Sequence, residues 1–155
     1  MAALRFNHME LTLPPGELSR WRGDLSAFYS EVFGFDVIDF KIFEQTALVL
    51  RTDAEGSQFL LILEHERSMA SPGYDHLGFL VESPEAVDRR LQACRAWQAK
   101  DSRVEILEYD DLVLEDTTTH SFYVRYGLPL WFDVQHIAYR PGREPKRQWR
   151  FVDSK

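Results

Sequence analysis

Apolar and polar residues alternate in two short segments, 6–13 and 74–81, that repeat one pattern 68 residues apart. The shared order is an aromatic residue, Asn or Asp, His, Met or Leu, any residue, Leu or Phe, any residue, and Leu or Val. Alternation with a period of two predicts a β-strand with one buried face. The repeat therefore predicts two equivalent strands, each with a histidine, His8 or His76, at the same position.

An amphipathic helix is predicted after each of these strands. Residues 17–33 carry apolar side chains at steps of three and four, and Gly34 then stands in the usual place for a left-handed cap. After the second strand, Ser83 and Pro84 form a typical helix start. Short β-like runs follow the helices at 35–43, 46–51, 58–64, 103–109, 120–126 and 130–138.

Each half of the chain thus reads β-α-β-β-β. We predict one α+β domain at 1–139, built from tandem βαβββ modules at about 4–66 and 74–139. The expected architecture is a cupped, barrel-like mixed β-sheet with the helices packed outside. The remaining residues, 140–155, form a basic C-terminal extension.

Composition narrows the class of protein. The chain has 155 residues, 45% hydrophobic and 28% charged, which is typical of one globular domain and excludes a disordered chain. No apolar run is long enough to span a bilayer and no secretion signal is visible, so a cytoplasmic location is expected. The single cysteine, Cys94, excludes an intramolecular disulfide and a Cys-rich zinc site.

The net charge of −7 is unevenly distributed. The extension 140–155 holds six Lys or Arg and two Asp or Glu, so it carries +4 and the rest of the chain −11. An acidic body argues against nucleic-acid binding, which relies on neutralising phosphates. The extension is interpreted as a solvated tail, as an anion-binding segment, or as an arm that docks on the acidic body or on a sister subunit. Trp149 and Phe151 favour docking.

Three segments, FYSEVFGF at 28–35, YDHLGFLV at 74–81 and HSFYVR at 120–125, resemble signatures of the vicinal oxygen chelate superfamily. That group includes glyoxalase I, fosfomycin and bleomycin resistance proteins, and extradiol dioxygenases. The resemblance covers about residues 4–139. It implies metal ligands on the first strand of each module and on one or both last strands, and it implies a homodimer. Function varies widely within the superfamily, so the chemistry does not follow from the fold.

Strand alternation supports a metal site. His8, His76 and Asp133 lie opposite the apolar sets of their strands, so all three are expected to point into the cup. Two imidazoles and one carboxylate suit a divalent metal ion and leave positions for water, substrate and dioxygen. Fe(II) is the favoured cofactor, with Mn, Zn, Ni or Co as alternatives. The metal would act as a Lewis acid on adjacent substrate oxygens.

The third ligand is left open by the sequence. The superfamily's last strand commonly carries a Glu ligand after an Asp-Pro-Asp-Gly turn. Alignment on Gly127 places Trp131 at this position, whereas alignment on the apolar-acid-apolar triplet places Asp133 there. Glu64, at the end of the first module's last strand, is an additional metal candidate, its other interpretation being an exposed strand-end acid.

Two further residues are catalytic candidates. His120 is a possible acid or base near the metal, its alternative being a structural histidine at the start of a strand. Tyr123, with Arg125 as a neighbour, is a candidate for orienting an anionic or phenolic substrate.

Three functions remain open at this point. The first is a metal-dependent enzyme for a small oxygen-rich or aromatic substrate, best an extradiol-type dioxygenase; a glyoxalase-type lyase or isomerase would need Glu64 as a fourth ligand. The second is a metal-free, drug-sequestering binding protein, which Trp131 at the ligand position would suit. The third is an accessory subunit that uses the basic extension. The expected partners are a small molecule and a second copy of the chain, with no nucleic acid and no membrane.

Overall fold

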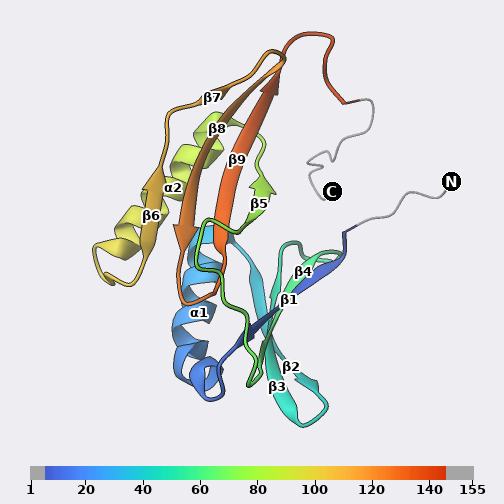
Figure 1. Ribbon diagram of the computed structural model, residues 1–155, viewed down its shortest axis with the longest axis vertical. Coiled ribbons are helices and arrows are strands. Elements are labelled where there is room, and N and C mark those ends of the chain that lie inside the picture. The colour runs from blue at the N-terminus through green and yellow to red at the C-terminus, as the bar shows by residue number, and fades with distance from the viewer. Residues whose placement is uncertain (1–5, 146–155) are drawn as a thin grey trace, which may run out of the picture.

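The computed structural model describes residues 6–145 and consists of two modules whose sheets stand apart (Figure 1). The first module contains β1 (His8–Leu13), α1 (Glu17–Phe33), β2 (Asp36–Ile42), β3 (Gln45–Arg51) and β4 (Phe59–Glu64). The second contains β5 (His76–Leu80), α2 (Pro84–Gln98), β6 (Glu105–Glu108), β7 (Leu112–Val113), β8 (Thr117–Arg125) and β9 (Trp131–Tyr139).

The two sheets have the same topology. The first sheet has the order β1-β4-β3-β2 and the second the order β5-β9-β8-β6, with the short β7 paired to one end of β8. In both, the first strand of the module runs parallel to the last and the other pairs are antiparallel. These arrangements confirm the predicted α+β fold of tandem βαβββ units. Within residues 6–145 no strand pair joins the two sheets, so β1 and β5 are both edge strands.

Helix α1 begins and ends where the sequence predicts, and α2 begins where it predicts. Gly34 adopts a left-handed conformation, with φ 71° and ψ 19°, and its N–H donates to the carbonyl of Ser30, which closes α1. At the start of α2, the Ser83 hydroxyl accepts a hydrogen bond of 3.2 Å from the N–H of Ala86. Pro84 follows in the first turn, where its missing N–H costs nothing.

One hydrophobic core joins the modules. Phe28 of α1 packs edge-on against Trp97 of α2, with ring centroids 5.5 Å apart, and also contacts Tyr126 after β8. The buried Tyr29 donates its hydroxyl to the carbonyl of Tyr126 at 3.0 Å, and burial raises the pKa of this phenol. Because α1 contributes to both modules' packing, the sheets are fixed relative to one another by side chains rather than by strand pairing.

The rest of the extension, 146–155, lies outside the described residues. No helix within 6–145 is long and apolar enough to cross a membrane.

Candidate metal and ligand site

Each sheet has one face toward the helices and one face away from them, which we call its cup face. On the helix side, β1 and β4 bury Leu11 and Ile62, and β9 buries Phe132 and Val134. The cup faces carry the alternate residues. On the second sheet these include His76, Tyr123, Arg125, Trp131 and Asp133, because His76 pairs with Trp131 and Tyr123 pairs with Asp133.

His76 and Asp133 form the polar centre of this face. The His76 Nε2 lies 3.9 Å from Asp133 Oδ2, and His76 Nδ1 lies 2.8 Å from the carbonyl of Tyr74. A carbonyl only accepts, so His76 Nδ1 donates to it, and when the ring is neutral Nε2 has a lone pair on the side of the carboxylate. Two electron-pair donors that face each other in this way are suited to a cation between them.

Asp133 is a buried polar residue on the cup face, with 6% of its surface exposed. Its Oδ1 is buried and accepts no hydrogen bond from residues 6–145. Burial raises the pKa of the carboxyl group, and the nearby His76 opposes this effect. An unpaired buried carboxylate is unfavourable unless a cation or a donor completes it. The residues present at this point therefore fit part of a metal site.

Tyrosines form one wall beside this pair. The ring of Tyr123 lies 5.0 Å from that of His76, centroid to centroid, and Tyr109 packs edge-on against Tyr123 at 5.4 Å. Burial, followed by the negative charge of Asp133, raises the pKa of Tyr123. The phenol thus stays protonated at neutral pH and is available as a hydrogen-bond donor.

Trp131 occupies the position across from His76. Its indole N–H donates to the carbonyl of Gly73 at 3.3 Å, and the Arg125 guanidinium lies 4.5 Å from the ring centroid. Arg125 is itself held by two hydrogen bonds to Glu105, of 2.9 and 2.8 Å. The ion pair with Glu105 offsets the charge of Arg125. The stacking of the Arg125 guanidinium on the Trp131 ring holds the indole in place.

His8 lies on the cup face of the first sheet, in different surroundings. Its ring stacks on Phe59 with centroids 5.0 Å apart, and its Nδ1 lies 2.8 Å from Asn7 Oδ1. The same face carries a small apolar cluster, Ala47, Val49 and Leu61. Within residues 6–145 no three His, Cys, Asp or Glu side chains lie close enough together to hold a metal ion. One chain therefore brings together His76 and Asp133, but not His8 with them.

Glu64, the additional metal candidate, lies away from the cup faces. Glu64 is two residues from the buried Ile62 on β4, so both side chains lie on the helix side of the sheet. There it accepts hydrogen bonds from the backbone N–H groups of Leu18, at 2.7 Å, and Ser19, at 3.4 Å. The first N–H groups of a helix lack partners within the helix, and Gly16 supplies no side chain to cap α1. Glu64 fills this structural role.

His120, a catalytic candidate, also lies away from the cup face. His120 lies on the same face of β8 as Phe122, which is buried on the helix side, whereas Tyr123 lies on the opposite face. Its Nδ1 lies 2.6 Å from Asp111 Oδ1 and its Nε2 lies 3.1 Å from Asp88 Oδ1. His120 thus ties the loop before β7 to α2 on the outside of the sheet.

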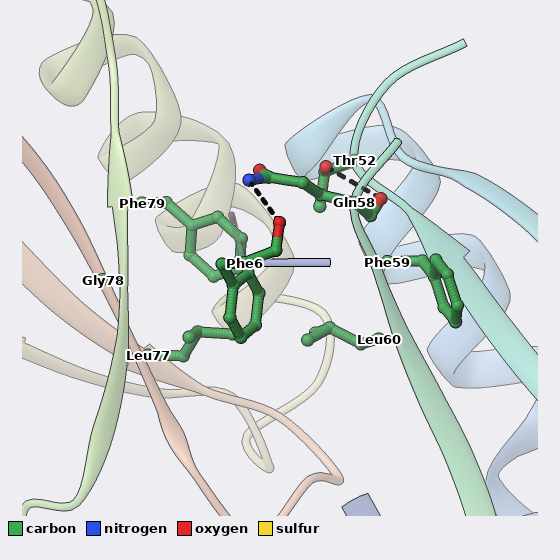
Figure 2. Close-up of a pocket in the computed structure, with 8 residues that line it drawn as sticks. All are labelled: Phe6, Thr52, Gln58, Phe59, Leu60, Leu77, Gly78 and Phe79. Atoms are coloured by element: carbon green, nitrogen blue, oxygen red, sulfur yellow. Dashed lines mark hydrogen bonds between the residues drawn. The ribbon is translucent and has the colours of Figure 1, made fainter. Parts of the chain in front are cut away.

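A hollow of about 270 Å³ lies between the modules (Figure 2). Figure 2 shows Leu77 and Phe79 of β5 on one side and Phe59 and Leu60 of β4 on the other. At its rim, the Gln58 amide donates to the carbonyl of Phe6 at 3.4 Å. The hollow is mainly apolar, and β5, which lines one side of it, also carries His76.

Glu105 and Tyr109 are site residues that sequence reasoning missed. Glu105 is opposite Arg125 across the β6–β8 ladder, and this register has no local sequence signal. Tyr109 comes directly after β6 and two residues after Leu107, which pairs with Tyr123. This two-residue spacing was the signal that could have placed Tyr109 on the same face as Tyr123.

Solved structures with this arrangement are numerous. The fosfomycin resistance protein FosX from Listeria monocytogenes superimposes with a TM-score of 0.59 at 18% identity, over 86% of this chain and 90% of that chain. A putative glyoxalase family protein from Bacillus anthracis gives 0.58 at 18% identity, over 88% and 97%. A virulence protein from Salmonella typhimurium gives 0.54 at 21% identity, over 88% and 98%.

The chain has the vicinal oxygen chelate fold. No protein-family model and no curated protein matches its sequence. One of the FosX structures contains Mn(II) and sulfate, and another contains Mn(II) and 1S,2S-dihydroxypropylphosphonic acid. One fold supports many chemistries, so the function of this chain has to be argued from its own side chains.

Proposed function

We propose that the protein is a divalent-metal-dependent enzyme that acts on a small oxygen-rich or aromatic molecule. The observation that carries this proposal is the pair of donors on the second cup face, the lone pair of His76 Nε2 and the buried, unpaired carboxylate of Asp133. Mn(II) in FosX structures of the same fold supports a divalent ion. Imidazole and carboxylate donors suit Fe(II), Mn(II) or Zn(II), and Fe(II) is our first choice.

We propose that His8 of a second copy supplies the third ligand. His8 and His76 hold equivalent positions in the two modules, yet the described part of one chain gathers no three ligands. On the cup face of the first sheet, Phe40 pairs with Ala47 and is 53% exposed, and an exposed apolar side chain is stabilised when another surface covers it. A homodimer with two-fold symmetry would form two identical sites, each from two chains.

In the proposed enzyme, the metal acts as a Lewis acid that polarises and orients bound substrate oxygens. His76 and Asp133 hold the ion, and the backbone bond of His76 Nδ1 fixes the tautomer that leaves Nε2 free to bind. Tyr123, protonated at neutral pH, donates a hydrogen bond to a substrate oxygen. Tyr109, which is 53% exposed, provides a flat apolar surface against which an aromatic ring can pack.

The finer proposal is an extradiol-type dioxygenase acting on a catechol-like substrate. Two histidines and one carboxylate leave open positions for a bidentate substrate and dioxygen. A glyoxalase-type lyase or isomerase is less well supported, because Glu64 caps α1 and does not reach the cup. A strongly anionic substrate is also less well supported, since Arg125 is already paired with Glu105.

A metal-free binding protein is the second candidate, and Trp131 is the observation that favours it. An indole, rather than an acid, stands opposite His76 and is anchored there by Gly73 and Arg125. In this case the aromatic cup would sequester an aromatic ligand without converting it.

Metal content after anaerobic purification tests the proposal. We expect about one transition-metal ion per chain in the wild type and a large loss in His8→Ala and in His76→Ala. His65→Ala, at an exposed histidine in the loop after β4, is the matched control and should keep the metal. No metal in the wild type, even after reconstitution, would overturn the enzyme and leave the binding protein.

Mixing the two variants tests the shared site. If each site takes His8 from one chain and His76 from the other, co-refolded His8→Ala and His76→Ala chains recover about a quarter of wild-type metal, because half of the dimers then hold one intact site. Sites contained within one chain would recover none. If iron is found, oxygen uptake with catechols separates the dioxygenase from other metal enzymes.

A further inference from the structure

An exposed apolar strip lies along the outer edge of the second sheet. Its residues, Leu112, Val113 and Leu114, are 57%, 71% and 58% exposed. β7 pairs with β8 on one side, and no strand within 6–145 covers its other side. An open sheet edge with large apolar side chains invites pairing with another segment, so folded proteins usually cover or charge it.

Acidic residues flank the apolar strip at both ends. Asp110 and Asp111 precede it and Glu115 and Asp116 follow it, with no basic residue between. Asp111 binds His120, but within the described part of the chain Asp110 and Glu115 form no ion pair. The strip therefore presents an apolar centre between negative ends, which suits a segment with cationic and aromatic residues.

The beginning of the basic extension already contacts one of these ends. The N–H of Arg140 donates to the carbonyl of Asp116 at 2.8 Å, and Arg143 Nε lies 3.4 Å from Asp116 Oδ1. That oxygen is buried and accepts no hydrogen bond from residues 6–145. The chain thus reaches the end of its described part, at residue 145, shortly after it has bound the acidic end of the strip.

The residues that follow complement the strip. Residues 146–155 carry four Lys or Arg against one Asp. Trp149 and Phe151 are two positions apart, the same spacing as Leu112 of β7 and Leu114 just after it, and residues two apart in an extended chain point the same way. Ten extended residues reach up to about 33 Å, whereas three residues of a strand cover about 10 Å. The extension is long enough to lie along the strip of its own chain.

We propose that residues 146–155 bind the outer edge of β7 in the same chain. Trp149 and Phe151 pack on Leu112 and Leu114, and the Lys and Arg side chains lie beside Asp110, Glu115 and Asp116. The interaction joins apolar contact to charge complementarity, in the manner of a peptide added to a sheet edge. It does not depend on the metal site.

Hydrogen exchange of the full-length protein tests this interaction. We compare the amides of 111–115 in the wild type and in Trp149→Ser/Phe151→Ser, which leaves the described domain unchanged. We expect exchange about tenfold faster in the variant, because an uncovered edge opens more often. Asp110→Asn/Glu115→Gln should move in the same direction, whereas Glu44→Gln/Glu66→Gln, two exposed acids of the first module, should match the wild type.

Two outcomes would overturn the proposal. Equal exchange in the wild type and in the Trp149→Ser/Phe151→Ser variant would mean that the extension does not cover β7. Protection that appears only as the protein concentration rises, over a fiftyfold dilution series, would assign the contact to the extension of another copy. Protection that is lost in the variant and independent of concentration supports binding within the chain.

Discussion

The cup faces of the two sheets occupy equivalent places in equivalent modules, yet their chemistry is opposite. Leu61 lies across from Glu10, two residues beyond His8, and Asp133 lies across from Gly78, two residues beyond His76. The first face combines its histidine with apolar residues and the exposed Glu10, whereas the second has a buried carboxylate and phenols. The helix-facing positions that fill the shared core are apolar in both modules, but cup-facing positions are free to differ. The second module therefore holds most of the candidate site, and the first contributes one histidine and an apolar wall.

The largest expected effect comes from placing the second face's carboxylate on the first face. Leu61→Asp would put an unpaired charge among Ala47 and Val49, and we expect it to lower the free energy of unfolding by about 3 kcal/mol. Urea unfolding at pH 7 measures this change. Leu63→Asp, at a half-buried position on the same strand face, is the control and should cost less. An equal loss of unfolding free energy in the two variants would contradict the burial of Leu61 in this apolar cluster.

The reverse exchange should stabilise the fold while removing metal binding. Asp133→Leu replaces a buried carboxylate that lacks a donor, and we expect a gain of about 1 to 2 kcal/mol in the metal-free protein. Metal affinity should fall more than about 100-fold, because a direct ligand is lost. Unfolding in the presence of a chelator and metal titration give the two values. A destabilised Asp133→Leu would mean that the carboxylate already makes a favourable interaction in the metal-free protein.

Most of the fold was predictable because periodicity is a local property of the sequence. The spacing of apolar residues and Gly34 gave the bounds of α1, and Ser83 with Pro84 gave the start of α2. β7 was missed because it has two residues, both exposed, so no alternation of buried and exposed positions marks it. The separation of the two sheets could not be predicted from the sequence either, because it depends on how α1 packs between the modules.

The candidate site was predictable only as far as strand parity reaches. Parity put His8, His76 and Asp133 on the cup faces, because side chains alternate across a strand. It cannot say which cup faces meet, so the separation of His8 from the other two was not foreseen. Glu64 shares its parity with Leu60 and Ile62, and that relation already indicated the helix side.

Removing the Glu64 carboxylate should affect α1 and leave the site unchanged. Backbone N–H groups of Gly16, Leu18 and Ser19 point at this carboxylate and hold its pKa below the ordinary value of 4.5. Its stabilisation is therefore present above pH 4.5 and is lost as the pH falls through the lowered pKa. Glu64→Gln should cost about 1 kcal/mol at pH 7, without a change in metal content. Glu66→Gln, an exposed neighbour, is the control, and a loss of metal in Glu64→Gln would return this residue to the site.

The smallest expected effect is a pH-dependent loss of stability in His120→Gln, on the helix side of the second sheet, opposite its cup face. Hydrogen bonds to Asp111 and then to Asp88 raise the pKa of His120, so protonated His120 stabilises the folded protein fully below pH 6.5 and loses this effect as the pH rises through the raised pKa. His136 lies across from His120 on β9 and its Nδ1 is hydrogen-bonded to the carbonyl of Val81. His136 is present in both the wild type and the His120 variant, so it does not contribute to the difference between them. His120→Gln should therefore cost up to about 1 kcal/mol at pH 6 and less at pH 9, measured by urea unfolding. Metal content should not change, because this side chain lies on the face away from His76; a parallel loss of metal would place His120 among the groups that support the site.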